Sequence, residues 1–140
     1  MRFKGLLNSI LIGELSALGH TDIIVIADAG FPIPLGPKLV DLSIIPGYPS
    51  VLQLCDVIGI EIPIDSILIA EEMQYKSPNI FEGIKIKVKE WECKNRGGIV
   101  PINITTHAKF KEISKNARVV IKTGEFSPYS NTIIYSGCAF

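Results

Sequence analysis

Short apolar segments alternate with amphipathic segments along almost the whole chain, and turn-forming residues separate them. Runs rich in Ile, Val and Leu predict strands at residues 23–27, 38–45, 66–70, 99–104, 117–122 and 131–135. Apolar residues at a helical spacing predict helices at residues 8–18, 49–58, 78–91 and 107–116. Because strands and helices take turns, the pattern favours an α/β fold with helices on both faces of the sheet. We find no linker or internal repeat, and we therefore expect a single domain over residues 1–140.

Glycine and proline at the ends of these segments have predictable roles. Gly19 fits the left-handed position after the first helix, and Pro49 fits the first turn of the second helix. Pro101 cannot donate to a sheet ladder, so the strand at residues 99–104 is expected at an edge or a bulge. Residues 95–98, with the sequence Asn-Arg-Gly-Gly, predict a turn.

The apolar strand at residues 23–27 has polar residues at both of its ends. A β-branched run between glycines is typical of a central strand that is buried on both faces. His20 and Asp22 precede this strand, and Asp28 follows it directly. Ionisable groups at the ends of such a strand lie where α/β sheets usually place their sites.

Composition and charge limit the kinds of partner. The 140 residues carry 14 basic and 14 acidic side chains, so no electrostatic footprint favours nucleic acid or an anionic membrane. Apolar residues make up 47% of the chain, which is high for a domain of this size. Some of these side chains would be exposed on a lone monomer, and burial between subunits removes them from water. We therefore expect a homo-oligomer.

The three cysteines are scattered and lack the spacing of a zinc site, a redox motif or a disulfide framework. Reduced thiols indicate a cytoplasmic protein. No uninterrupted apolar run reaches the ~18 residues of a membrane span, and the N-terminal residues do not form a signal peptide.

The candidate chemical groups are two histidines and an aspartate. His20 and His107 lie at junctions between elements, where histidines often have a purely structural role. The alternative is acid/base work, for which an imidazole that titrates near neutral pH is well suited. Asp28 either forms an Asx turn or accepts hydrogen bonds from a polyhydroxy ligand. A metal site needs more convergent ligands than these residues supply.

A polar loop at residues 124–131 adds further hydrogen-bonding groups. Its sequence, Gly-Glu-Phe-Ser-Pro-Tyr-Ser-Asn, fits a simple polar turn. It equally fits a site in which Glu125, Ser127, Tyr129, Ser130 and Asn131 offer hydrogen-bonding groups to a ligand with several hydroxyl groups. Glycine-rich phosphate loops and nucleophile-elbow motifs are absent from the sequence, which argues against a nucleotide enzyme and a serine hydrolase.

Five short motifs occur together in one order along the chain. They are Gly-His-Thr-Asp at 19–22, Asp-Ala-Gly-Phe-Pro-Ile-Pro at 28–34, Ile-Ala-Glu-Glu at 69–72, Thr-Thr-His at 105–107, and the loop at 124–131. Over essentially its whole length the chain resembles the D-ribose pyranase family of sugar mutarotases. Thr21, residues 30–34 and the Ser127-Pro128 pair favour this family over the related L-fucose mutarotases. Phe126 and Ser130 depart from the residues common in the family, Cys and Ala.

The resemblance implies an activity and a set of site residues. Members of the family are isomerases that interconvert the β-pyranose and β-furanose forms of D-ribose in ribose catabolism, without a cofactor or metal. The proton donor of the family corresponds to His20. The ribose-binding residues of the family correspond to Asp28, His107, Tyr129, Ser130 and Asn131.

The resemblance also implies an architecture. It is a three-layer α/β/α sandwich with a mixed, mostly parallel sheet, assembled as rings that stack into a homodecamer, with sites between neighbouring subunits. Two alternatives remain at this point. One is an L-fucose mutarotase, and the other is a non-catalytic sugar-binding partner of a ribose transport system.

Overall fold

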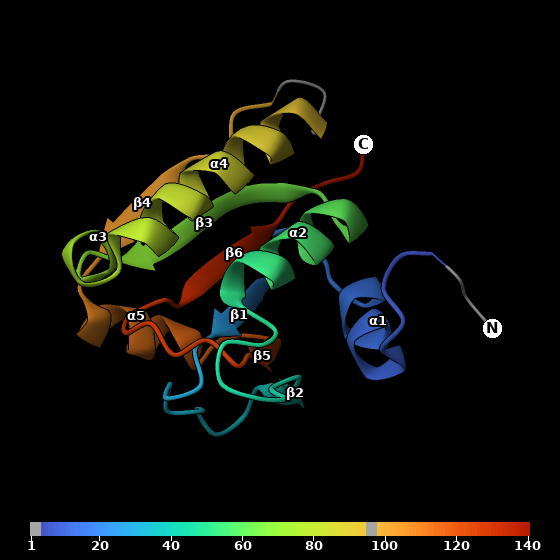
Figure 1. Cartoon of the computed structure of the whole chain (residues 1–140). Helices are drawn as coiled ribbons and strands as arrows, with labels where there is room; N and C mark the ends of the chain where they lie inside the picture. Colours follow the sequence, from blue (N-terminus) through green and yellow to red (C-terminus); the bar gives the residue numbers. More distant parts are fainter. Residues whose placement is uncertain (1–3, 95–97) are drawn as a thin grey trace.

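Figure 1 shows the computed structural model of the chain, which describes residues 4–94 and 98–140. Its centre is a six-stranded sheet with the strand order β2-β5-β1-β6-β3-β4. The strands are β1 Ile23–Ala27, β2 Lys38–Asp41, β3 Ile64–Ala70, β4 Ile102–Thr105, β5 Val119–Lys122 and β6 Thr132–Ser136. The helices are α1 Ser9–Ser16, α2 Val51–Glu61, α3 Met73–Lys76, α4 Pro78–Lys94 and α5 His107–Ser114.

Five strands run in one direction and β6 runs against them. β1 and β2 each pair in parallel with β5, and β3 pairs in parallel with β4. β6 lies between β1 and β3 and is antiparallel to both. The sheet is therefore mixed and mostly parallel. The carboxyl ends of β1 to β5 consequently meet at one edge of the sheet, together with the amino end of β6.

Helices cover both faces of the sheet, which gives three layers. Ile24 and Ile26 of β1 pack in the core formed with α1, α2 and α4, whereas Val25 and Ala27 pack in the core formed with α5. Figure 1 shows α2 and α4 over one face and α5 beyond the other. Alternate side chains of a strand point to opposite faces, so a central strand needs apolar residues at every position. The predicted burial of this strand on both faces is confirmed.

The turn before β1 differs from the prediction. α1 ends at Ser16, and Thr21 rather than Gly19 has a left-handed backbone, with φ 67°. The N–H of Gly19 donates to the Asp22 carboxylate at 2.8 Å. This side-chain contact, which the helix pattern does not contain, determines the shape of the turn.

The prediction for Pro49 is also wrong, because the helix begins two residues later. Ser50 is the N-cap of α2 and accepts a hydrogen bond from the N–H of Gln53, whose side chain in turn accepts from the N–H of Ser50. This capping box satisfies the free donors of the first turn, so Pro49 lies outside the helix.

Other boundaries shift by a few residues. β2 is shorter than predicted, and α3 is a single turn that the apolar pattern does not reveal. β4 begins after Pro101 and is an edge strand, as that proline predicts. Most of the turn predicted at residues 95–98 falls outside the described residues. Within residues 4–94 and 98–140, no helix is long and apolar enough to span a membrane.

Candidate functional site

Polar residues from four separate parts of the chain meet at the carboxyl edge of the sheet. Asp28 follows β1, Glu72 follows β3, and His107 follows β4. The loop at residues 124–131 joins β5 to β6 at the same edge. This convergence follows from the strand directions, because parallel strands place their following loops together.

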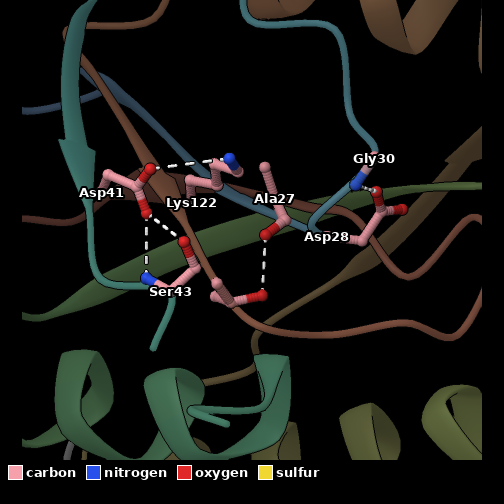
Figure 2. Close-up of polar contacts among 7 residues, drawn as sticks. Ala27, Asp28, Gly30, Asp41, Ser43 and Lys122 are labelled. Carbon is pink, nitrogen blue, oxygen red and sulfur yellow. Dashed lines mark hydrogen bonds and ion pairs between the residues drawn. The ribbon is translucent and has the colours of Figure 1, made fainter. Parts of the chain in front are cut away.

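Asp28 and Asn131 hold each other in a fixed arrangement. The side-chain amide of Asn131 donates to Oδ2 of Asp28 at 2.8 Å, and its Oδ1 accepts from the backbone N–H of Asp28 at 2.8 Å. The N–H of Gly30 donates to Oδ1 of Asp28 at 3.0 Å, which forms the predicted Asx turn (Figure 2). Both carboxylate oxygens are thus oriented by donors, and both residues are buried.

The environment of Asp28 changes its acidity. Burial raises the pKa of the Asp28 carboxyl above its ordinary value, because removal from water disfavours the charged form. Hydrogen bonds from Asn131 and Gly30, and the proximity of His107, act in the opposite direction. At a given pH, a larger fraction of Asp28 is therefore protonated than of a solvent-exposed aspartate.

His107 is the first residue of α5. The hydroxyl of Thr106 caps this helix by accepting from the N–H of Lys109. The N–H of His107 donates to the Glu72 carboxylate, with distances of 3.1 and 3.3 Å to its two oxygens. Burial lowers the pKa of His107, and Lys111 lowers it further against the opposing effect of Glu72 and Asp28. The imidazole is therefore neutral at pH 7.

Aromatic rings surround the imidazole of His107. Tyr129 meets it edge-on with ring centroids 4.9 Å apart, and Phe110 stacks with it at 6.4 Å. Phe31 lies edge-on to both His107 and Phe110. Tyr129 reaches this position with a left-handed backbone, φ 58°. These contacts fix the orientation of the imidazole without using its hydrogen-bonding atoms.

Three buried polar atoms at this edge lack a hydrogen-bond partner among the described residues. They are Nδ1 of His107, Oγ of Ser130 and Oγ1 of Thr132, the first residue of β6. An unpaired buried polar group costs about 1–3 kcal/mol, so such atoms are usually satisfied by a partner. Together with the oriented Asp28 carboxylate, they form a set of donors and acceptors suited to a hydroxylated ligand.

A hollow of about 330 Å³ lies at Asp28 and is lined by residues 28–30 and 125–128. Its wall includes Glu125, a buried carboxylate that accepts from the N–H of Ser127 at 3.0 Å. The hydroxyl of Ser77 donates to the carbonyl of Pro128 at 2.6 Å and fastens the loop to the junction of α3 and α4. The hollow is of a size that suits a monosaccharide.

A second polar cluster, formed by Asp41, Ser43 and Lys122, lies along the same edge. Asp41 at the end of β2 is 3.5 Å from the ammonium group of Lys122, and its carboxylate also accepts from the N–H and hydroxyl of Ser43 (Figure 2). These contacts, led by the Ser43 hydroxyl, lower the pKa of Asp41. The Asp41 carboxylate thus already has hydrogen-bond and ion-pair partners within the chain, in contrast to Nδ1 of His107 and Oγ of Ser130.

The structure does not bring His20 to this site within one chain. His20 precedes β1 and Asp28 follows it, so the five residues of the strand separate them by about 16 Å. The imidazole is half-exposed, with Nε2 3.9 Å from Oδ1 of Asp65 at the start of β3. The other five predicted site residues lie together at the carboxyl edge, and His20 lies at the opposite edge.

Two residues near the site were not predicted to belong to it. Glu72 supports His107, and Phe31 forms part of the aromatic wall. Glu125, which the polar loop offered as a hydrogen-bonding group, lines the hollow. The position of Glu72 just after a predicted strand could have indicated a site residue, since such a residue shares the sheet edge with Asp28. Within the described residues, no group of three or more His, Cys, Asp or Glu side chains is arranged to hold a metal ion.

Comparison with known proteins identifies the family to which this fold and site belong. The chain belongs to the RbsD / FucU transport protein family, whose model matches residues 1–139. A D-ribose pyranase of Geobacillus thermodenitrificans (strain NG80-2) is 40% identical over 140 residues, covering 100% of this chain and 99% of that protein. The resemblance found from the five motifs is thus confirmed.

Solved structures agree with this assignment. Bacillus subtilis RbsD, solved in complex with D-ribose, is 36% identical and has a TM-score of 0.90 over 100% of both chains. The fucose mutarotase of Streptococcus pneumoniae, solved with L-fucose, is 26% identical and has a TM-score of 0.76 over 95% of this chain and 94% of that one. The similarity to Bacillus subtilis RbsD, with a TM-score of 0.90, confirms the predicted fold.

Proposed function

We propose that this chain is a D-ribose pyranase, an isomerase that interconverts β-D-ribopyranose and β-D-ribofuranose without a cofactor. A full-length relative with this name at 40% identity and a relative solved with D-ribose support the proposal. The observation that carries it is the pair of buried, unpartnered atoms on His107 and Ser130 beside the oriented carboxylate of Asp28. A pentose supplies hydroxyl groups that satisfy all of these atoms at once.

The residues at the carboxyl edge bind the sugar. Asp28 accepts hydrogen bonds from hydroxyl groups, and neutral His107 accepts one at Nδ1. Tyr129 packs its ring against the sugar, and Ser130 and Asn131 complete the hydrogen-bonding set. Holding the hydroxyl groups in place favours reclosure of the open-chain sugar to the required ring size.

His20 supplies the acid/base chemistry from a second copy of the chain. Ring opening places a proton on the ring oxygen and removes one from the anomeric hydroxyl, and reclosure through the other hydroxyl reverses these transfers. An imidazole can donate and accept protons within one cycle, and such a group typically contributes ~10²–10⁴-fold to the rate. The distance from His20 to Asp28 within one chain supports a site formed between neighbouring subunits.

Exposed apolar side chains beside the hollow support this assembly. Ile44 is 70% exposed and Phe126 is 68% exposed, and Phe126 lines the hollow. Such surface is buried when subunits associate. The assembly is a ring homo-oligomer that stacks into a decamer. The protein acts as a single domain over residues 1–140 and is located in the cytoplasm.

Exchange between sugar forms tests the activity. Proton NMR saturation difference measures pyranose–furanose exchange of D-ribose with and without the wild-type protein. We expect exchange well above the rate in buffer, and its loss in His20→Ala with the oligomer intact by size-exclusion chromatography. Wild-type exchange at the rate in buffer would contradict the proposed activity, and normal exchange in His20→Ala would contradict the role of His20.

A mixture of inactive variants tests whether the site is shared between subunits. His20→Ala and Asp28→Ala each lack one part of the site. Mixed rings restore a complete site wherever an intact His20 faces an intact Asp28, which is about a quarter of the interfaces in a random 1:1 mixture. Activity recovered on co-refolding, with none in either variant alone, supports the shared site. No recovery in mixed rings of the wild-type size contradicts it.

Two alternatives have distinct outcomes in the same measurement. The similarity to a fucose mutarotase solved with L-fucose makes anomer exchange of L-fucose the second candidate activity. Faster exchange of L-fucose than of D-ribose would favour it. Ribose binding by calorimetry without any exchange would instead indicate a sugar-binding partner of a transport system.

A further inference from the structure

Asp65 occupies an irregular position in the sheet. Ile64 of β3 pairs with Ser136 of β6, and Ser66 of β3 pairs with Tyr135 of β6. Two residue steps along β3 therefore correspond to one step along β6. Asp65 is the extra residue of this β-bulge. A bulge turns the side chain of its extra residue away from the regular alternation of the strand, and bulges are frequent next to active sites.

Gly137 accommodates this bulge. A Cβ atom on Gly137 would lie 3.2 Å from the backbone nitrogen of Asp65 and 3.3 Å from the carbonyl carbon of Ile64. The N–H of Gly137 donates to the carbonyl of Pro63 at 2.9 Å. The backbone around Asp65 is therefore packed closely and held in one position.

The backbone that carries His20 is held by the end of β6. The N–H of Thr21 donates to the carbonyl of Ser136 at 2.8 Å, and the N–H of Ser136 donates to the carbonyl of Asp22 at 3.0 Å. The hydroxyl of Ser136 also donates to the carbonyl of Gly19. The backbone of His20 is thus fixed, and its imidazole is half-exposed.

The carboxylate of Asp65 lies at ion-pair distance from the imidazole of His20. Its Oδ1 lies 3.9 Å from Nε2 of His20, and its Oδ2 accepts from the hydroxyl of Ser66 at 3.1 Å. Asp22, the other nearby carboxylate, instead contacts the N–H of Gly19 and lies 3.7 Å from the guanidinium of Arg118. Among the described residues, His20 is the one basic side chain at ion-pair distance from Asp65.

We propose that Asp65 is a positioning residue for His20, an inference that rests on the proposed function. The bulge places the Asp65 carboxylate at ion-pair distance from Nε2, 3.9 Å away, and its negative charge favours the tautomer with the proton on that nitrogen. Nδ1 then faces away from Asp65 and is the nitrogen that exchanges a proton with the sugar. The state of one ring nitrogen is set by the contact that the other makes.

Asp65→Asn tests this role because it removes the charge and keeps the shape. Because Asp65 acts on His20 rather than on a sugar-binding residue, KM should stay at the wild-type value while kcat falls about 2- to 5-fold, the scale of an exposed charge pair. Asp65→Glu, which keeps the carboxylate, should recover at least half of the lost kcat. Asp56→Asn is the matched control, since it removes a half-exposed aspartate paired with Lys87 and should leave kcat unchanged.

A double variant separates positioning from a general structural effect. If Asp65 acts through His20, Asp65→Asn should have no further effect on the residual exchange of His20→Ala. The ¹⁵N chemical shifts of the His20 ring, which report the tautomer, should move in Asp65→Asn and stay in place in Asp56→Asn. Asp65→Ser provides the same test if the amide at position 65 disturbs folding.

The inference is overturned by an unchanged kcat in a folded, oligomeric Asp65→Asn, by a rise in KM alone, or by an equal loss in the His20→Ala background. It is also overturned if the His20 ring of the wild type carries its proton on Nδ1. These outcomes leave the proposed function intact when the wild type still accelerates ribose exchange. If the wild type does not accelerate ribose exchange, the proposed function itself is contradicted.

Discussion

Replacing Asn131 with alanine should destabilise the protein strongly, because this side chain satisfies two buried groups of Asp28. The change removes a hydrogen bond at 2.8 Å to the carboxylate and another at 2.8 Å from the backbone N–H. A hydrogen bond to a charged group contributes about 1.5–3 kcal/mol, and an unsatisfied buried N–H costs about 1–3 kcal/mol. The expected loss is about 3–5 kcal/mol, a large part of the ~5–15 kcal/mol of a typical domain.

The loss should depend on pH with a definite sign. Burial raises the pKa of Asp28 in the folded state, so ionisation of this group lowers stability as pH rises through that value. The Asn131 amide opposes this effect by stabilising the carboxylate. Its removal should therefore cost more at pH 7 than at pH 4, because a larger fraction of Asp28 is ionised at the higher pH.

Urea unfolding at a fixed protein concentration measures these changes. Trp91, the single tryptophan, is buried and provides the fluorescence signal. Thr132→Val is the matched control, because Thr132 follows Asn131 in the chain. This change removes a buried hydroxyl that has no partner among the described residues. This control should be neutral or stabilising by up to about 1 kcal/mol.

A double-mutant cycle with Asp28→Ala tests the reasoning directly. With the carboxylate gone, the loss of the Asn131 amide should cost at least 1 kcal/mol less than it does in the wild type. Additive losses, a loss below 1 kcal/mol in Asn131→Ala, or a loss independent of pH would each refute the account of this pair.

Three further predictions concern the site and the packing that supports it. His107→Phe should keep the fold, because the imidazole packs among aromatic rings, but should raise the KM for ribose about 10-fold through the lost hydrogen bond at Nδ1. Since the pKa of His107 is lowered in the folded state, the wild type should lose stability as pH falls from 7 to 5, and the variant should lose less in urea titrations. Burial raises the pKa of Cys55 to about 12, so a thiol reagent at pH 8 should modify the two exposed cysteines of the native protein and reach Cys55 only after unfolding. Gly59→Ala should cost about 3 kcal/mol in thermal unfolding, because its Cβ would lie 1.8 Å from Nε1 of Trp91, whereas Gly13→Ala, with open space around it, should stabilise α1 by about 0.5–1 kcal/mol.

The local elements were predictable because they depend on neighbouring residues. The strand Ile23–Ala27 was predicted with its observed limits, and the start of α5 at His107 was predicted as well. Apolar runs, helical spacing and N-cap hydroxyls act over a few residues, so the sequence contains the whole signal. The prediction failed at Gly19 and Pro49, where contacts of Asp22 and Ser50 determine the backbone instead.

The sequence by itself determined which residues are available for chemistry and which runs form the sheet. Only the tertiary structure decided which of them meet. The antiparallel insertion of β6 between β1 and β3 brings Asn131 to Asp28, although 103 positions separate them in the chain. The same strand directions place His20 at the far end of β1, beside Asp65. Strand order and direction arise from long-range packing, which local patterns do not encode.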